Sequence, residues 1–283
     1  MEVVRDLDAW RHAAAAARQR GRTVGLVPTM GALHAGHDSL VRAARDRGDY
    51  VIVTIFVNPR QFNDPADLRA YPRTPETDRA RAAALGVDLL VEPSLEQMWP
   101  AYPAPVATTV HVGGMTEHLE GADRPGHFDG VASVVAKLFA LTGPARAYFG
   151  EKDFQQLAMV RQMVTDLGFA VEVVACPIVR EEDGLALSSR NVRLSGAGRQ
   201  RALGLSRAVA AAAAQPATAS VLRQRMRAVL AEAGVEVAYA EVVDPETLRP
   251  SGDGESGRRR ALVAGRVDGV RLIDNADVEL KGE

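Results

Sequence analysis

The stretch TVGLVPTMGALHAGHDSLVRAARDRGDYVIVTIFV, residues 23–57, predicts a strand, a helix and a second strand in succession. Residues 23–27 are mostly apolar, and residues 35–47 carry apolar side chains at helical spacing. Residues 50–57 are apolar almost throughout, which is typical of a parallel strand buried on both faces. Such a strand–helix–strand unit indicates a parallel sheet whose strands are joined by crossing helices.

The alternation of strands and helices continues beyond this unit. We expect strands at 87–91, 106–112, 145–149 and 171–175, and helices at 75–85, 128–141 and 153–167. The pattern changes after residue 177, where helices at 195–214 and 220–233 precede strands at 235–243, 261–267 and 270–273. The sequence therefore predicts an α/β fold, with a doubly wound parallel sheet over residues 1–176 and a smaller α+β domain over residues 177–283.

The composition excludes several classes of protein. The chain has 283 residues with 34 basic and 36 acidic side chains, a net charge of −2 that gives no sign of a nucleic-acid-binding surface. No apolar run has the length of a membrane helix, and residues 1–11 lack the apolar core of a secretory signal. The single cysteine, Cys176, excludes an internal disulfide framework. We expect a cytoplasmic location and no membrane association.

The turn after the first strand, residues 30–37 (MGALHAGH), is the first candidate site. Backbone N–H groups at a helix start suit phosphate, and the imidazoles of His34 and His37 suit the charge on a transferring phosphoryl group. A capping histidine beside a surface histidine is the alternative interpretation. Zinc binding is disfavoured because no third ligand is nearby, and the P-loop and dinucleotide glycine motifs are both absent.

Three further polar segments are candidates. Residues 58–63 (NPRQFN) and 150–156 (GEKDFQQ) follow predicted strands, and residues 187–191 (LSSRN) lie just past the expected domain boundary. Amides suit hydroxyl or carboxylate groups, and a lysine or arginine suits phosphates. Taken singly, each is also explained as a turn, a helix cap or a solvated loop. Because parallel strands end at a shared edge, one ligand can contact the segments that follow them. The arginines at 258–260 are expected to be a solvated charge run.

An ordered set of motifs runs from about residue 24 to residue 275. They are VPTMGALHAGH (27–37), FVNPRQF (56–62), YPRT (71–74), RPGHF (124–128), YFGEKD (148–153), PIVRE (177–181), LSSRN (187–191) and RLIDN (271–275). The full set resembles the pantothenate synthetase (pantoate–β-alanine ligase) family of the His-x-Gly-His nucleotidyltransferase-like superfamily. The His-x-Gly-His element alone is shared with many nucleotidyltransferases. The resemblance implies a Rossmann-like N-terminal domain, a smaller C-terminal domain that closes over the site, and a homodimer.

The resemblance also implies a reaction, the ATP-dependent ligation of pantoate and β-alanine to pantothenate in vitamin B5 and coenzyme A biosynthesis. The pantoate carboxylate attacks the α-phosphate of Mg-ATP and releases pyrophosphate. The amine of β-alanine then attacks the pantoyl adenylate and releases AMP. The implied partners are these three small molecules, with Mg²⁺ accompanying ATP, and the sequence does not indicate which protein groups contact the metal.

Functional residues of the family carry over to matching positions. The implied catalytic residues are His34, His37 and Lys152, with His37 as a proton donor. The implied ATP-binding residues are Met30, Gly31, Ala32, Leu33, His34, Ala35, Gly36, His37, Gly150, Glu151, Lys152, Asp153, Val179, Leu187, Ser188, Ser189 and Arg190. The implied pantoate-binding residues are Gln61, Gln156, Val131, Val134 and Val135, and Gln61 is also implied to bind β-alanine.

The sequence departs from the family pattern at two places, and two other functions stay open. Asp38 stands where an apolar residue is expected, and its carboxylate weakens phosphate binding if it points toward the ligand. Residues 63–67 differ in a segment expected to be a flap. A nucleotidyltransferase acting on another acid or phosphate ester is one alternative, which substrate screening separates. A nucleotide-binding module without turnover is the other, indicated by ATP binding without pyrophosphate release.

Overall fold

The computed structural model describes residues 1–282 of the chain and contains two compact units. The first unit comprises residues 1–151 and 159–177. The second comprises Lys152–Ala158 and the chain from Ile178 onward. The short segment Lys152–Ala158 therefore belongs, by its contacts, with the chain from Ile178 onward, although the residues on both sides of it belong to the first unit.

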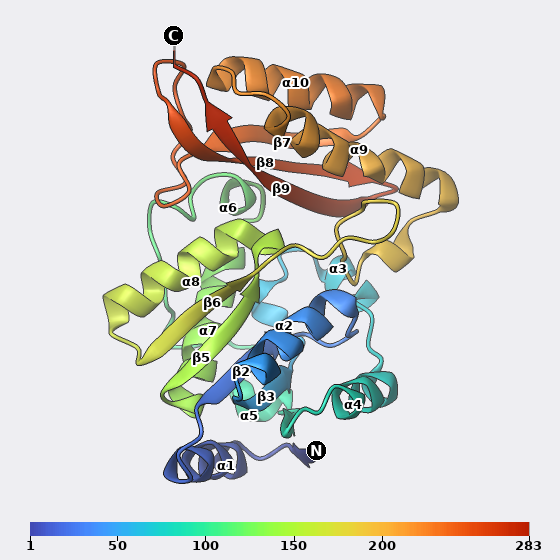
Figure 1. Ribbon diagram of the computed structural model, residues 1–283. Helices are drawn as coiled ribbons and strands as arrows, with labels where there is room; N and C mark the ends of the chain where they lie inside the picture. The colour runs from blue at the N-terminus through green and yellow to red at the C-terminus, as the bar shows by residue number, and fades with distance from the viewer. Residues whose placement is uncertain (283) are drawn as a thin grey trace. The chain divides into compact units, whose positions relative to one another are not determined.

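The first unit is built on a parallel six-stranded sheet of order β1-β4-β3-β2-β5-β6 (Figure 1). Its strands are β1 (Glu2–Val4), β2 (Val24–Thr29), β3 (Tyr50–Ile55), β4 (Leu89–Val91), β5 (Ala145–Gly150) and β6 (Val171–Cys176). The pairing of β2 with β3 runs without interruption from Val24 opposite Tyr50 to Thr29 opposite Ile55. The predicted doubly wound parallel sheet is confirmed.

Helices cover both faces of this sheet. They are α1 (Leu7–Gln19), α2 (Ala35–Asp46), α3 (Pro65–Ala70), α4 (Pro75–Ala84), α5 (Leu95–Met98), α6 (Glu120–Asp123), α7 (His127–Thr142) and α8 (Phe154–Leu167), and the first residues of α8 belong to the second unit. On one face, α2 and α4 bury Leu40 and Ala82 against Val27 and Val53. On the other, α7 contacts β2 and packs against α1 (Figure 1).

The local structure differs from the expectation in several places. The strand expected at 106–112 is wrong: these residues form no ladder, and most of their side chains are exposed, so β-branched composition alone does not make a strand without a neighbour to pair with. The backbone N–H of Val110 donates to the hydroxyl of Ser133 instead. The elements β1 and α1 were not expected, although Asp6 caps α1 by accepting from the N–H groups of Asp8 and Ala9.

The second unit is an α+β arrangement, as predicted. Its antiparallel sheet has the order β7-β8-β9, formed by β7 (Glu236–Val243), β8 (Gly257–Val267) and β9 (Val270–Leu280). Two helices, α9 (Gly196–Ala213) and α10 (Ala219–Glu232), bury one face of this sheet (Figure 1). The strand β8 begins before the expected residue 261, so the arginines at 258–260 lie in a strand and not in a loop. Across residues 1–282, no helix combines the length and the apolar character needed to span a membrane.

Candidate functional site

The strand order of the first sheet reverses between β2 and β5, which are neighbours. The strands β2, β3 and β5 all run in the same direction, so Thr29, Ile55 and Gly150 end them at one edge. In open α/β sheets, ligands bind outside the carboxyl ends of the strands at such a reversal. Three of the four candidate segments begin at this edge.

His34 and His37 form a reciprocal pair at the start of α2. His34 is the N-cap residue, and its Nδ1 accepts from the N–H of Gly36 at 3.1 Å. The Nδ1 of His37 accepts from the N–H of His34 at 3.3 Å, and the two ring centroids lie 4.1 Å apart. A neutral imidazole that accepts at Nδ1 carries its proton on Nε2. Capping uses the Nδ1 of both rings, so it does not exclude a ligand at Nε2.

The turn before these histidines is held by Asp78, a residue that sequence reasoning missed. The carboxylate of Asp78 on α4 accepts from the N–H groups of Ala32 and Leu33 at 2.9 and 2.7 Å, and from the Thr74 hydroxyl at 3.1 Å. Asp78 is 1% exposed. Gly31 has φ +82°, and a Cβ there would lie 3.1 Å from an Asp78 oxygen. No local signal marks Asp78, because it lies 45 or more residues beyond the turn.

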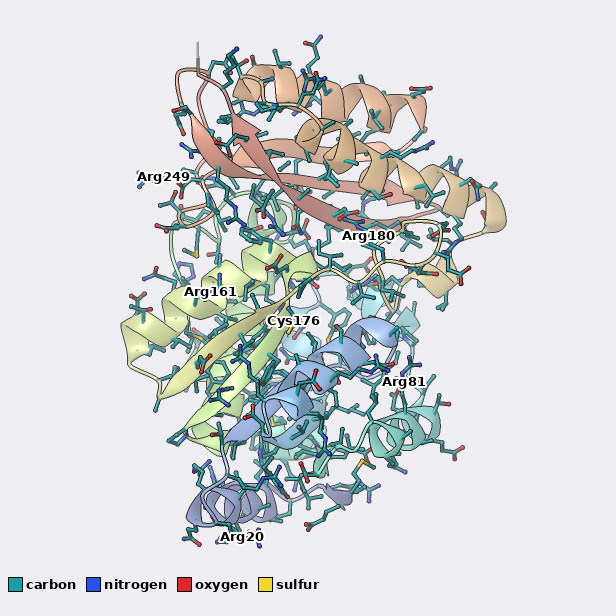
Figure 2. All side chains as sticks on the ribbon, in the orientation of Figure 1. Arg20, Arg81, Arg161, Cys176, Arg180 and Arg249 are labelled. Carbon is teal, nitrogen blue, oxygen red and sulfur yellow. The ribbon has the colours of Figure 1, made fainter. Side chains whose placement is uncertain are left out.

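The carboxylate of Asp38 contacts two arginines. Arg81 on α4, labelled in Figure 2, donates to both Asp38 oxygens at 2.6 and 2.9 Å. Arg42, four residues along α2, lies 3.6 Å from the same carboxylate. The hydrogen bond to Asp38 raises the pKa of the Arg81 guanidinium further above its ordinary value. The positive charge of two guanidiniums thus exceeds the negative charge of the Asp38 carboxylate, so Asp38 does not give the start of α2 a net negative charge.

Asn58 and Gln61 follow β3 and bond to each other. Asn58, buried, donates from Nδ2 to Gln61 Oε1 and to the carbonyl of Gly130, both at 3.0 Å. Gln61 donates from Nε2 to the Met30 sulfur at 3.1 Å, which joins this turn to the His34 turn. A Cβ on Gly130 would lie 2.2 Å from the Arg60 carbonyl, so the glycine permits close packing of α7. The buried residues Val131, Val134 and Val135 all lie on α7.

Lys152 lies in the 3₁₀ turn η2 (Glu151–Asp153), at the start of the second unit's short segment. Its carbonyl accepts from Asn275 Nδ2 at 2.9 Å, and its Nζ lies 3.7 Å from an Asp153 oxygen. Glu151, in the same turn, and Gln156, in the first turn of α8, are half-buried.

Arg260 is not solvated, which corrects the expectation for the 258–260 run. It is 5% exposed and donates to Asn275 Oδ1 at 2.8 Å and to Asp277 Oδ1 at 2.7 Å. Its guanidinium lies 4.4 Å from the centroid of the Phe154 ring. Burial opposes ionisation of Asp277, but hydrogen bonds from Arg258 and Arg260 lower its pKa overall. The expectation failed because a strand alternates its side chains between two faces, and one face here is buried.

The remaining candidate residues lie together in the second unit, in the segment that precedes α9. The N–H of Leu187 donates to the carbonyl of Val179 at 3.0 Å, so these two residues are brought side by side. Ser188 Oγ accepts from the N–H of Arg190 at 3.2 Å, and Ser189 lies between them. Arg180, labelled in Figure 2, anchors the segment through both oxygens of Asp274 on β9, at 2.6 and 3.0 Å.

Within residues 1–282, no three His, Cys, Asp or Glu side chains are grouped so as to hold a metal ion. The candidate residues of the first unit offer imidazole, amide and backbone N–H groups, and those of the second unit offer amide, ammonium and guanidinium groups. These are donors for phosphate and carboxylate oxygens.

Comparison with known proteins gives a consistent result. The family described as pantoate-beta-alanine ligase matches residues 2–277. A pantothenate synthetase from Paracoccus denitrificans is 53% identical over 286 residues, which cover 99% of each chain. The crystal structure of pantothenate synthetase from Thermus thermophilus has a TM-score of 0.89 at 48% identity, covering 98% of this chain and 99% of that one. A pantoate-beta-alanine ligase from Francisella tularensis, complexed with beta-gamma ATP and beta-alanine, has a TM-score of 0.81 at 32% identity, covering 98% and 97%.

Proposed function

Because the chain belongs to the pantoate–β-alanine ligase family, we propose that it forms pantothenate through a pantoyl adenylate. A pantoate carboxylate oxygen attacks the α-phosphorus of ATP, and the bond to pyrophosphate breaks. The amine of β-alanine then attacks the acyl carbon, the bond to AMP breaks, and the amine loses a proton as the amide forms. Adenylation is needed because a free carboxylate has no good leaving group, whereas AMP is one.

The observation that carries this proposal is the histidine pair at the start of α2. Each Nδ1 is engaged by a backbone N–H, which leaves Nε2 as the protonated nitrogen of each neutral ring. We assign the Nε2 groups of His34 and His37 to the phosphates of ATP, with His37 as the proton donor. Charge that develops on the phosphate oxygens during attack is stabilised by such preorganised donors.

We assign the rest of the ATP site to both units of the chain. Residues 30–37 and 150–153 contribute backbone N–H groups and the Lys152 ammonium. Val179 and residues 187–190 contribute backbone groups, two hydroxyls and the Arg190 guanidinium. Mg²⁺ enters as part of the substrate Mg-ATP, since this ion is commonly held by phosphate oxygens and water with few protein ligands.

We assign the pantoate site to Gln61, Gln156 and the apolar surface of α7. Val131, Val134 and Val135 form the apolar wall for the carbon skeleton of pantoate, and the two amides bind its oxygens. Gln61 also contacts β-alanine, which places the amine near the acyl carbon that it attacks. The hydrogen bond from Gln61 Nε2 to the Met30 sulfur supports this assignment, because a thioether is a weak acceptor that a ligand oxygen readily replaces.

We further propose that residues 1–176 bind ATP and pantoate while residues 177–283 close over the site. The enzyme acts as a cytoplasmic homodimer. Analytical ultracentrifugation tests the dimer, and small-angle scattering with and without ATP and pantoate tests closure. Unchanged scattering on addition of both ligands contradicts closure.

An isotope experiment tests the central step. Pantoate labelled with ¹⁸O in its carboxylate is mixed with ATP alone, and pyrophosphate is measured; β-alanine is then added, and AMP and pantothenate are analysed by mass spectrometry. The proposal expects pyrophosphate release before β-alanine is present and one ¹⁸O atom in AMP. Unlabelled AMP contradicts the adenylate. If the protein binds ATP but releases no pyrophosphate with pantoate, another acid is the substrate. If it binds ATP and releases no pyrophosphate with any acid, it is a nucleotide-binding module without turnover.

A further inference from the structure

Trp99 lies directly behind the Asn58–Gln61 amide pair. It follows α5 and is 6% exposed, and its indole Nε1 donates to Asn58 Oδ1 at 2.9 Å. Asn58 is 1% exposed, so the bond between them is shielded from water. None of the motifs that indicate the family includes Trp99.

The indole N–H determines which way the Asn58 amide points. In the observed orientation, Asn58 Oδ1 accepts from Trp99 and from the N–H of Arg60 at 3.3 Å, and Nδ2 donates to two oxygens. A flipped amide would set its NH₂ group against two donors and its oxygen against two acceptors. In a buried site each such mismatch leaves polar groups unsatisfied, which is costly.

The orientation of Asn58 then determines that of Gln61. Asn58 Nδ2 donates to Gln61 Oε1 at 3.0 Å, so the Gln61 amide must turn its Nε2 away from Asn58. That nitrogen donates to the Met30 sulfur at 3.1 Å. The series of hydrogen bonds from Trp99 through Asn58 to Gln61 therefore ends in an N–H donor at Gln61. If the amide of either Asn58 or Gln61 were flipped, the series would end in a carbonyl oxygen.

The indole ring itself is fixed by cations. The guanidinium carbon of Arg60 lies 5.4 Å from the Trp99 ring centroid, and Lys137 Nζ lies 5.1 Å from it. Lys137 also donates to the carbonyls of Gln97 and Met98, and burial lowers the pKa of its ammonium group. Two cations over one ring and a bond at its nitrogen restrict both the position and the rotation of the indole.

We propose that Trp99 is a positioning residue that makes Gln61 present an N–H donor to an oxygen of the bound hydroxy acid. The proposal rests on the assignment of Gln61 to pantoate under the proposed function. Trp99 acts through Asn58 and Gln61, so we expect a larger effect on the KM for pantoate than on the KM for ATP.

The test removes one N–H group and keeps the aromatic ring. Trp99→Phe retains an aromatic surface for Arg60 and Lys137 but lacks the donor to Asn58. We expect the KM for pantoate to rise about tenfold, as for the loss of one well-made hydrogen bond, while the KM for ATP stays within about twofold. Trp10→Phe is the matched control, because Trp10 is also buried and its Nε1 has no hydrogen-bond partner among the described residues 1–282. It is expected to leave both KM values within about twofold.

A double-mutant cycle separates positioning from general loss of packing. If Trp99 acts through Gln61, Trp99→Phe changes the KM for pantoate by less than about twofold in a Gln61→Ala background. An undiminished tenfold rise in that background overturns the proposal, as does an unchanged KM in the single variant. If Trp99→Phe does not fold, benzothienylalanine at position 99 replaces the N–H by sulfur in the same shape and is measured instead. The wild-type enzyme is assayed first. If it makes no pantothenate, the proposed function is refuted, and this outcome is distinct from a failure of the proposal for Trp99.

Discussion

The turn that carries His34 and His37 and the turn that carries Lys152 follow neighbouring strands, β2 and β5, but they are held in different ways. In the first, the two histidines are bonded within a few positions of each other, and Asp78 and Gln61 supply distant contacts. In the second, the Lys152 carbonyl is bonded by Asn275, 123 residues further along the chain. A motif fixed by its own neighbours can be recognised locally, whereas one fixed by a distant strand depends on the whole fold.

Asp78→Ala should have the largest effect. It removes the acceptor for two backbone N–H groups in a buried turn, and each unsatisfied group costs about 1–3 kcal/mol. We expect a loss of about 3 kcal/mol in the free energy of unfolding, measured by urea denaturation, with loss of pyrophosphate release. Glu76→Ala is the control, since Glu76 is exposed on the same helix. A normal urea midpoint for Asp78→Ala would show that the turn holds its shape without that carboxylate.

Asn275→Ala should act on the Lys152 turn with a smaller loss. The Lys152 carbonyl loses a donor, and Arg260 loses one acceptor but keeps Asp277. We expect a destabilisation of about 2 kcal/mol in urea denaturation and a reduced rate of pyrophosphate release. Arg258→Ala is the control, because that side chain is 72% exposed. Slower pyrophosphate release with an unchanged free energy of unfolding would mean that Asn275 acts on the Lys152 turn without supporting the fold. If neither quantity changes, Asn275 does not hold this turn.

The fold was largely predictable from the sequence because periodicity is a local property. The apolar patterns of residues 35–47 and 50–57 predicted α2 and β3, and the histidine pair was recognised from its place between a strand and a helix. Asp78 and Trp99 were not found, and Asn275 was noted only as part of the motif at 271–275. Each acts on residues tens of positions away, and no local pattern shows which residues those are. Arg260 was misjudged because charge predicts exposure on average, and only the strand register reveals that it is buried.

Lys152→Ala should reduce catalysis and leave the fold intact. The substitution removes the ammonium but keeps the carbonyl that Asn275 binds, so the urea midpoint should not change. We expect pantoate-dependent pyrophosphate release to fall at least about tenfold, which is about 1.4 kcal/mol in the activation barrier. Lys281→Ala, at an exposed position beyond β9, serves as the control. Near-wild-type release by folded Lys152→Ala would exclude a role for this ammonium on the phosphates.

Ala32→Gly should have the smallest effect and the opposite sign. Ala32 has φ +50°, a left-handed conformation that costs a residue with a Cβ about 1–2 kcal/mol. Glycine relieves that strain, but it also increases the entropy of the unfolded chain by about 0.5–1 kcal/mol. The expected net gain is therefore about 0.5 kcal/mol in urea denaturation. Ala43→Gly, the same change inside α2, should instead cost about 1 kcal/mol. If both substitutions destabilise the protein equally, Ala32 stores no backbone strain, and the hydrogen bonds that Asp78 accepts are enough to explain the conformation of the turn.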